Sequence, residues 1–119
     1  MDKKTTVEDL KNKVKKFCED RDWDQFHSPK ELAIGMSTEA NELLQLFRFK
    51  SEEDMKEFMS SSRKIEAEEE LADLAYFVFR FAQMNNIDLT TAIENKMKKN
   101  NTKYPVEKAK GSNKKYNEF

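Results

Sequence analysis

Glycine and proline together account for only four of the 119 residues of this chain. An average chain holds about 12% of the two, and this one holds about 3%. β-Hairpins and β-sandwiches need such residues in their turns, so an all-β fold is excluded and we expect an all-α protein. The length allows a single domain.

The same composition excludes several kinds of site. One cysteine cannot form a disulfide framework or a CxxC metal site, and two glycines cannot build a glycine-rich phosphate loop. The longest apolar run, Leu74 to Phe79, is far shorter than the roughly 20 residues of a membrane span, and no stretch resembles a signal peptide. We therefore expect a cytoplasmic protein without a membrane partner.

Charge is distributed unevenly along the chain, although the net charge is only −1. Residues 38–73 hold 11 acids and 5 bases, whereas residues 94–115 hold 8 lysines and 2 glutamates. The basic stretch lacks interleaved aromatic residues, so nucleic-acid binding is not expected. With only 37% hydrophobic residues, a single copy would have a thin core, and partner subunits would complete it.

Apolar residues recur at helical spacing in several segments, which predicts a bundle of four to five helices. The expected helices run from a Thr6 cap to about Asp22, from a Ser28 cap to about Phe49 or Lys50, from a Ser51 cap through Met59, from about Arg63 to Asn86, and from an Asp88 cap to a point before Pro105. Residues 1–105 would form the helical domain, and the Lys- and Asn-rich residues 106–119 a mobile tail.

The fourth expected helix is the most apolar one. Between Leu74 and Ala82 only Arg80 is polar, and a helix that is apolar nearly all round is buried on several sides. In so small a chain, this predicts a helix that lies between its own bundle and a second subunit. The bundle would therefore be completed by dimerisation.

The second and the fourth expected helix each carry a pair of carboxylates. Glu39 and Glu42 are three residues apart, as are Glu70 and Asp73, so each pair shares one helix face. Such pairs also arise by chance on solvated faces of a highly charged chain. Beside apolar stripes, however, clustered carboxylates are costly unless a cation joins them, and one or two Mg²⁺ or Mn²⁺ ions suit oxygen ligands.

These motifs resemble a known family. The two acidic pairs with 27 residues between them, followed by Lys96, Asn100 and Lys103-Tyr104-Pro105, look like the all-α nucleoside triphosphate pyrophosphohydrolases of the MazG type. Residues 21–30, RDWDQFHSPK, are similar to the entrance segment of the dCTP pyrophosphatase-like branch. The resemblance covers roughly residues 7–105. It implies Mg²⁺-dependent hydrolysis of a nucleoside triphosphate to the monophosphate and pyrophosphate by a dimer or a dimer of dimers.

The resemblance also implies roles for individual residues. The Mg²⁺ ligands and catalytic residues would be Glu39, Glu42, Glu70 and Asp73. The nucleotide would be bound by Trp23 on the base, Lys96 on the phosphates, Asn100 near the sugar or base, Tyr104 beside the nucleotide, and Phe49 where this branch often has a second Trp. Phe77 stands where the branch often has a Tyr. Either Glu66 or Glu69 could orient the attacking water.

Two further polar residues have less specific signals. Arg80 is a candidate for pairing with Glu69, Asp73 or a phosphate, because it is the one cation in its apolar stretch. His27 is expected to bond a backbone group near the Ser28 cap, with a ligand contact as the alternative.

The resemblance therefore implies an enzyme that removes non-standard or surplus pyrimidine deoxynucleotides, such as dCTP or modified dCTP. The alternative is a non-enzymatic helical dimer that serves as a protein-interaction module. The two hypotheses differ in one testable property, because only the enzyme requires a metal ion.

Overall fold

The structure is a computed structural model that describes residues 1–118 of the chain. All of its regular elements within these residues are helical, as the scarcity of glycine and proline predicts. The elements are α1 (Val7–Glu19), a 3-10 turn (Asp24–Phe26), α2 (Pro29–Gln45), α3 (Glu52–Ser60), α4 (Lys64–Met84), α5 (Leu89–Lys103), α6 (Val106–Ala109) and a second 3-10 turn (Tyr116–Glu118).

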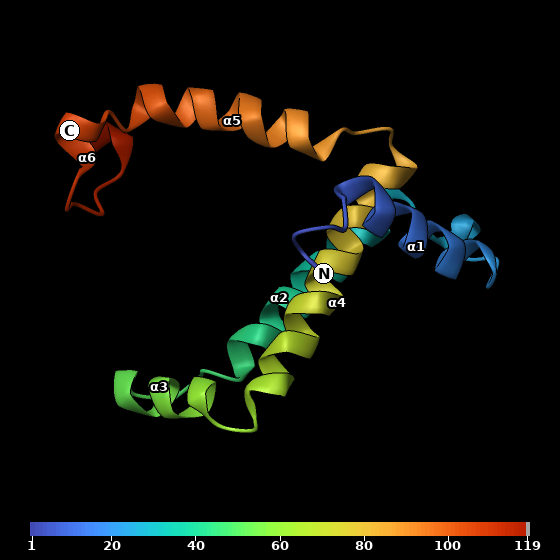
Figure 1. The fold of residues 1–119 in the computed structure, drawn as a ribbon, viewed down its shortest axis with the longest axis horizontal. Coiled ribbons are helices and arrows are strands. Elements are labelled where there is room, and N and C mark those ends of the chain that lie inside the picture. Colours follow the sequence, from blue (N-terminus) through green and yellow to red (C-terminus); the bar gives the residue numbers. More distant parts are fainter. Residues whose placement is uncertain (119) are drawn as a thin grey trace. The chain divides into compact units, whose positions relative to one another are not determined.

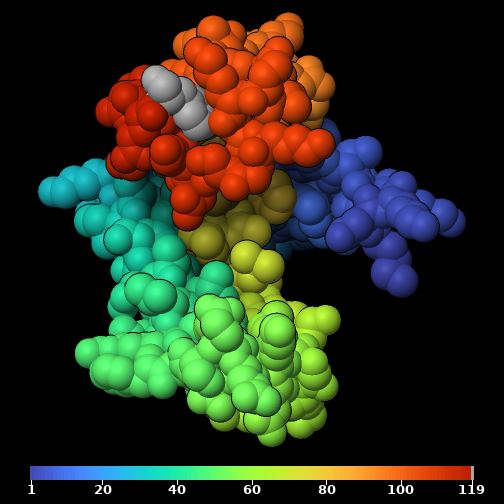
Figure 2. All heavy atoms as spheres, turned by 90° about the vertical axis from the view of Figure 1, so that its left-hand side faces the viewer, coloured from blue at the N-terminus to red at the C-terminus, as the bar shows by residue number. Residues whose placement is uncertain are grey.

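The chain divides into two compact units, Met1–Asn86 and the part that begins at Ile87. In the first unit α2 and α4 run side by side in opposite directions, and α1 packs on α4 (Figure 1). The atoms of α3 lie against the first turns of α4 (Figure 2). The second unit contains α5 and α6. The α2–α4 pair thus forms the centre of the first unit.

The helices begin where the sequence places their caps. Thr6 Oγ1 accepts a hydrogen bond from the Asp9 N–H at 3.0 Å, and Asp9 Oδ2 accepts one from the Thr6 N–H at 2.9 Å. These two bonds satisfy backbone donors that have no partner inside the helix. Side-chain caps also precede α2, α3 and α5, at Ser28, Ser51 and Asp88 respectively.

Two helices end earlier than predicted. α1 ends at Glu19 instead of near Asp22, and α2 ends at Gln45 instead of near Phe49. Asp22 has φ 55° and Phe49 has φ 64°, and a right-handed helix cannot continue through such left-handed residues. In the predicted tail the structure places α6 and the second 3-10 turn. That the tail is mobile stays a prediction.

Few apolar side chains of the described residues are fully buried. The buried hydrophobic residues are Cys18, Leu32, Phe58, Ala67 and Ala82. Arg80 is the largest side chain that is completely buried. No helix in the described part of the chain has the length and apolar content that a membrane crossing requires.

A glycine allows the close approach of α2 and α4. A Cβ atom at Gly35 of α2 would lie 2.5 Å from the ring of Phe77 on α4, which is well inside van der Waals contact. The Phe77 ring itself packs edge-on against Tyr76 at a centroid distance of 5.0 Å. The missing side chain of Gly35 therefore makes the space that the Phe77 ring occupies.

Replacing this glycine by alanine should destabilise the protein. The Gly35→Ala change gains about 1 kcal/mol in helix propensity, but overpacking of this kind costs about 1–3 kcal/mol. We expect a net loss of about 1 kcal/mol in the free energy of unfolding, measured by urea denaturation. Ser37→Ala, at an exposed position of the same helix, is the matched control and should not destabilise. Equal stability of the two variants would contradict the close contact.

Candidate active site

The predicted carboxylates of α2 and α4 meet in the structure. One carboxylate oxygen from each of Glu39, Glu70 and Asp73 lies within 4.8 Å of the other two. The first two side chains are partly buried, whereas Asp73 is exposed. Because α2 and α4 are antiparallel, residues 31 positions apart in the sequence face each other across one seam (Figure 1).

Glu42 is exposed but interacts with the same cluster. Burial, followed by a hydrogen bond shared with Glu42 and by the charges of the neighbouring carboxylates, raises the pKa of Glu39 to about 7. The pKa of Glu70 is also raised, first by its hydrogen bond with Glu42 and then by burial. The four predicted carboxylates thus form one electrostatically coupled group.

The geometry of this acidic cluster suits a divalent cation. The Oε2 atoms of Glu39 and Glu70 are buried and have no hydrogen-bond partner, so two strong acceptors are unsatisfied. A buried carboxylate oxygen without a partner is costly, and a cation would satisfy it. All donors are oxygens, the ligands that Mg²⁺ and Mn²⁺ prefer. The residues present therefore fit the metal that the sequence predicts.

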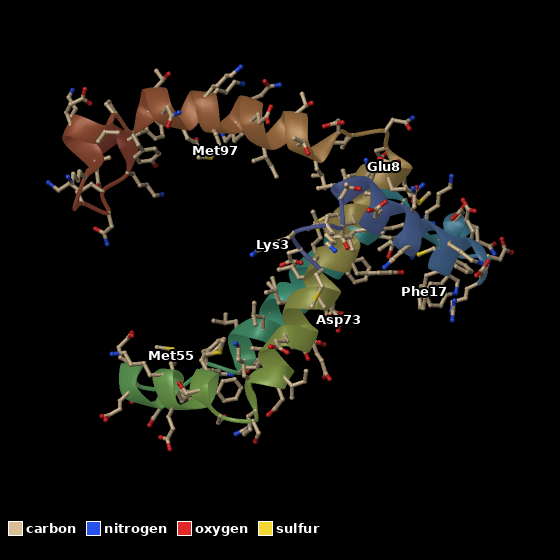
Figure 3. The ribbon with its side chains drawn as sticks, in the orientation of Figure 1. Lys3, Glu8, Phe17, Met55, Asp73 and Met97 are labelled. Carbon is tan, nitrogen blue, oxygen red and sulfur yellow. The ribbon has the colours of Figure 1, made fainter. Side chains whose placement is uncertain are left out.

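An aromatic pocket of about 340 Å³ opens beside the acidic cluster. Its walls come from α1, the following turn, α2 and α4. Two of the lining residues, Glu39 and Asp73, belong to the acidic cluster. The lining residues are Phe17, Trp23, His27, Glu39, Asp73, Tyr76 and Phe77. Figure 3 labels Phe17 on α1 and Asp73 on α4. A ligand that has both an aromatic ring and negative charges could therefore use the two parts of this site together.

The aromatic walls support one another edge-on. The ring centroids of Phe17 and Trp23 are 5.7 Å apart, and those of Phe17 and Tyr76 are 6.0 Å apart. The Tyr76 hydroxyl lies 2.9 Å from Cys18 Sγ. Burial and this contact raise the pKa of the Tyr76 phenol above its ordinary value, so the ring stays neutral at physiological pH. In each T-shaped contact the edge of one ring meets the face of the other, and the Arg21 guanidinium lies 3.8 Å from the Phe17 ring centroid.

Two pocket residues were missed by the sequence analysis. Phe17 and Tyr76 repeat at helical spacing with the apolar residues of their helices, and that pattern predicts core packing, not a pocket. A signal was present for one of them, because Tyr76 and Phe77 follow Asp73 by three and four residues and so lie on the same side of α4. Phe17 could not be found in this way, since its place in the pocket depends on how α1 packs on α4.

The remaining predicted nucleotide residues are not among those that line the pocket within the first unit. Phe49 is 91% exposed, and its ring contacts the Arg48 guanidinium at 4.6 Å. Lys96 and Asn100 are on α5 of the second unit, and Tyr104 caps the C-terminus of that helix. The Tyr104 ring packs edge-on against Tyr116 at 6.2 Å. Roles for these residues at a nucleotide stay predictions.

The structure corrects the expected partners of Arg80 and His27. Arg80 pairs with the carboxylate of Asp24, not with Glu69 or Asp73. His27 Nδ1 accepts a hydrogen bond from Arg80 Nε at 2.9 Å, so this ring nitrogen bonds a side chain of α4 and not a backbone group near the Ser28 cap. Both partners are more than 50 residues away in the sequence, beyond what local patterns can predict.

Fold and site together define an all-helical protein in which carboxylates of two antiparallel helices meet beside an aromatic pocket. The model of the MazG-like family matches residues 34–119. The chain belongs to this family, as its sequence motifs predict.

Relatives and a solved structure support the assignment. Over 115 residues, which are 96% of this chain and 68% of each relative, the chain is 33% identical to dCTP pyrophosphatase 1 of Homo sapiens and 35% identical to that of Bos taurus. The crystal structure of a pyrophosphatase from Archaeoglobus fulgidus is similar with a TM-score of 0.77 and 35% identity, covering 82% of this chain and 91% of that one.

The acidic cluster should make the metal-free protein less stable as the pH rises. Glu39 has a pKa of about 7 in the folded protein against an ordinary value of 4.5, so between these values the folded state binds more protons than the unfolded state. Folding stability attributable to Glu39 is therefore present below about pH 4.5 and lost towards pH 7. In EDTA, we expect the melting temperature to fall by several degrees across this window.

Glu39→Gln should flatten this pH dependence, whereas Glu68→Gln, an exposed acid elsewhere on α4, should leave it unchanged. A melting temperature of the wild type that rises with pH over the same window would contradict the coupling.

Proposed function

We propose that this chain is a Mg²⁺-dependent nucleoside triphosphate pyrophosphohydrolase that converts deoxynucleoside triphosphates, with pyrimidines such as dCTP or modified dCTP preferred, to the monophosphate and pyrophosphate. The observation that carries the proposal is the meeting of unsatisfied carboxylates with an aromatic pocket. The class of enzyme is supported by relatives named dCTP pyrophosphatase 1 and by a similar structure named a pyrophosphatase.

The carboxylates explain why a cation is needed. A triphosphate carries about four negative charges and would be repelled by an acidic cluster without an intervening cation. Glu39, Glu70 and Asp73, whose oxygens lie together, would hold Mg²⁺, and Glu42 beside them would be the fourth ligand. When bound, the ion neutralises phosphate charge, polarises the α-phosphorus and lowers the pKa of water. Binding to the ion would then offset the desolvation cost of the two buried oxygens of Glu39 and Glu70.

The aromatic residues would bind the other end of the substrate. Phe17, Trp23, Tyr76 and Phe77 line the pocket that begins at Glu39 and Asp73, so a base stacked there places its phosphates towards the carboxylates. This arrangement positions the α-phosphorus for attack by water. A bond forms between the water oxygen and the α-phosphorus while the bond to the α–β bridging oxygen breaks, and pyrophosphate leaves.

The structure bears on which carboxylate orients the water. Glu66 accepts a 2.7 Å hydrogen bond from Arg63 Nε, and this partner lowers the pKa of the Glu66 carboxyl. A carboxylate committed to an ion pair is a poorer base for water. Glu69, exposed on the same helix, is the better candidate of the two that the sequence left open.

The alternative function, a non-enzymatic interaction module, is not favoured. It would leave the convergence of three carboxylates on one seam and the aromatic pocket beside them without a role. The similarity to dCTP pyrophosphatase 1 extends over 96% of this chain.

Exposed apolar residues support assembly into a homo-oligomer. On α2 and α4 several large apolar side chains are about half exposed or more, namely Ile34, Leu44, Ile65 and Leu71. A second copy that covers these faces would complete the thin core of the first unit. The proposal is therefore a dimer or a dimer of dimers.

The decisive experiment is turnover of a nucleotide panel with Mg²⁺ or with EDTA. We expect monophosphate and pyrophosphate only with the metal, and fastest turnover for pyrimidine deoxynucleotides. Glu70→Gln and Asp73→Asn should each lower kcat by about 100-fold or more, because each removes a ligand of the charge-stabilising ion. Product separation by ion-exchange chromatography measures both.

Glu68→Gln removes the same charge from an exposed position of α4 and serves as the control, with activity close to the wild type. Full activity of both ligand variants, or turnover in EDTA, would reject the metal-dependent mechanism. Absence of any turnover with Mg²⁺ or Mn²⁺ would reject the enzyme and favour the interaction module.

The oligomer can be tested separately. Sedimentation equilibrium should give a mass of two or four copies of the 14.1 kDa chain. Leu71→Lys, which places a charge at a position 56% exposed in one copy, should shift the equilibrium towards the monomer. Lys56→Leu on α3 is not expected to have this effect. A mass of one copy for the wild type would overturn the assembly.

A further inference from the structure

Arg80 is buried in a way that stability alone does not explain. Its side chain is only 1% exposed, and it is the largest fully buried side chain of the first unit. A buried ion pair is generally no more stabilising than well-packed apolar side chains of similar size. What such a pair does fix is geometry, because each donor of a guanidinium has its own direction.

The three donor groups of Arg80 have three different partners. Nε donates to His27 Nδ1 at 2.9 Å, Nη1 donates to Gln83 Oε1 at 2.6 Å, and Nη2 donates to the carboxylate of Asp24. Gln83 lies one turn further along α4, whereas Asp24 and His27 belong to the turn between α1 and α2. The guanidinium therefore links this turn to the central helix.

The same turn forms a wall of the aromatic pocket. Trp23 and His27 both line it, and their ring centroids are 6.2 Å apart. Other hydrogen bonds of the turn are local, such as that from the Trp23 N–H to the Cys18 carbonyl at 3.0 Å and that from the Gln25 amide to the Asp22 carbonyl at 3.1 Å. Arg80 is the contact that determines where the turn lies relative to α4.

Arg80 also determines how the imidazole of His27 is protonated. Because Nδ1 accepts the bond from Arg80, it carries no proton, and the neutral ring has its proton on Nε2. Nε2 lies on the side of the ring away from Arg80. A fixed N–H donor in the lining of the pocket could recognise an acceptor of a bound base, such as a ring carbonyl oxygen.

We propose that Arg80 is a positioning residue of the nucleotide pocket, which holds the turn from Trp23 to His27 against α4 and fixes His27 as an Nε2–H donor towards the base. This inference rests on the proposed function for the identity of the ligand. The arrangement of the wall itself is independent of that function.

The chain offers two reporters for this wall, because it contains one tryptophan and one histidine. Trp23 fluorescence reports the position of the turn, and the ¹⁵N resonances of the His27 ring report its tautomer. Arg80→Lys keeps the charge but cannot bond three acceptors in the directions of a guanidinium. Asp24→Asn removes the charge of a half-exposed carboxylate but keeps an acceptor oxygen for Arg80 Nη2, so it weakens the link without changing a buried side chain and should fold even where Arg80→Lys does not.

In the wild type, we expect an unprotonated Nδ1 and a protonated Nε2. In both variants acrylamide quenching of Trp23 should increase by about twofold, and KM for the preferred nucleotide should rise by about tenfold while kcat changes by less than about threefold. In the double variant, quenching and KM should change no more than in the more affected single variant, because both substitutions act on the same link between the turn and α4. Asp20→Asn, which removes the same charge from an exposed pair with Lys16, is the control and should change none of these quantities.

A proton on Nδ1 of the wild type would overturn the assignment of the His27 donor. Unchanged quenching and unchanged KM in both variants would overturn the positioning role, as would a loss confined to melting temperature. If the wild type turns over no nucleotide, the proposed function fails, and the tautomer and the quenching still decide whether Arg80 holds this wall.

Discussion

The packing of α2 against α4 places like charges together, and this repulsion is the constraint on which the rest of the site depends. Glu39 and Glu70 approach from opposite helices because the apolar stripes of these helices must meet, and the carboxylates lie beside those stripes. Hydrophobic burial thus holds carboxylates in an arrangement that they would not adopt alone. The raised pKa of both glutamates records the electrostatic cost of that arrangement.

The aromatic pocket follows from the same pair of helices. Asp73 and Glu39 lie at its boundary with the acidic cluster, and Phe77 extends its wall one turn further along α4. The walls formed by α1 and by the turn after it come from outside this pair, and Arg80 connects the turn to α4. One part of the site therefore depends on helix packing, and another on a single buried cation.

Much of the fold could be predicted because its determinants are local. Caps at Thr6, Ser28, Ser51 and Asp88 mark where helices begin, and each of these signals lies within four residues. The predicted ends near Asp22 and near Phe49 or Lys50 were wrong by three to five residues, since apolar periodicity does not reveal a left-handed backbone.

The candidate site was predictable to a different degree. Spacing within a helix brings Glu70 and Asp73 to one face, and the antiparallel neighbour adds Glu39, so the acidic cluster could be predicted from the motifs. The pairing of Arg80 with Asp24 could not, because a polar residue in an apolar helix has several possible partners and only tertiary packing selects one. The same reason explains why Phe17 was not placed in the pocket.

The contact between Gly35 and Phe77 has a consequence for how the pocket can change. A side chain at position 35 and a large ring at position 77 compete for one volume, so substitutions at these two positions are expected to compensate for each other across family members. Phe77 also lines the pocket. Selection for a wider or narrower ligand therefore acts on α2 and α4 at once, and an engineered change of substrate size would have to treat these two residues as a unit.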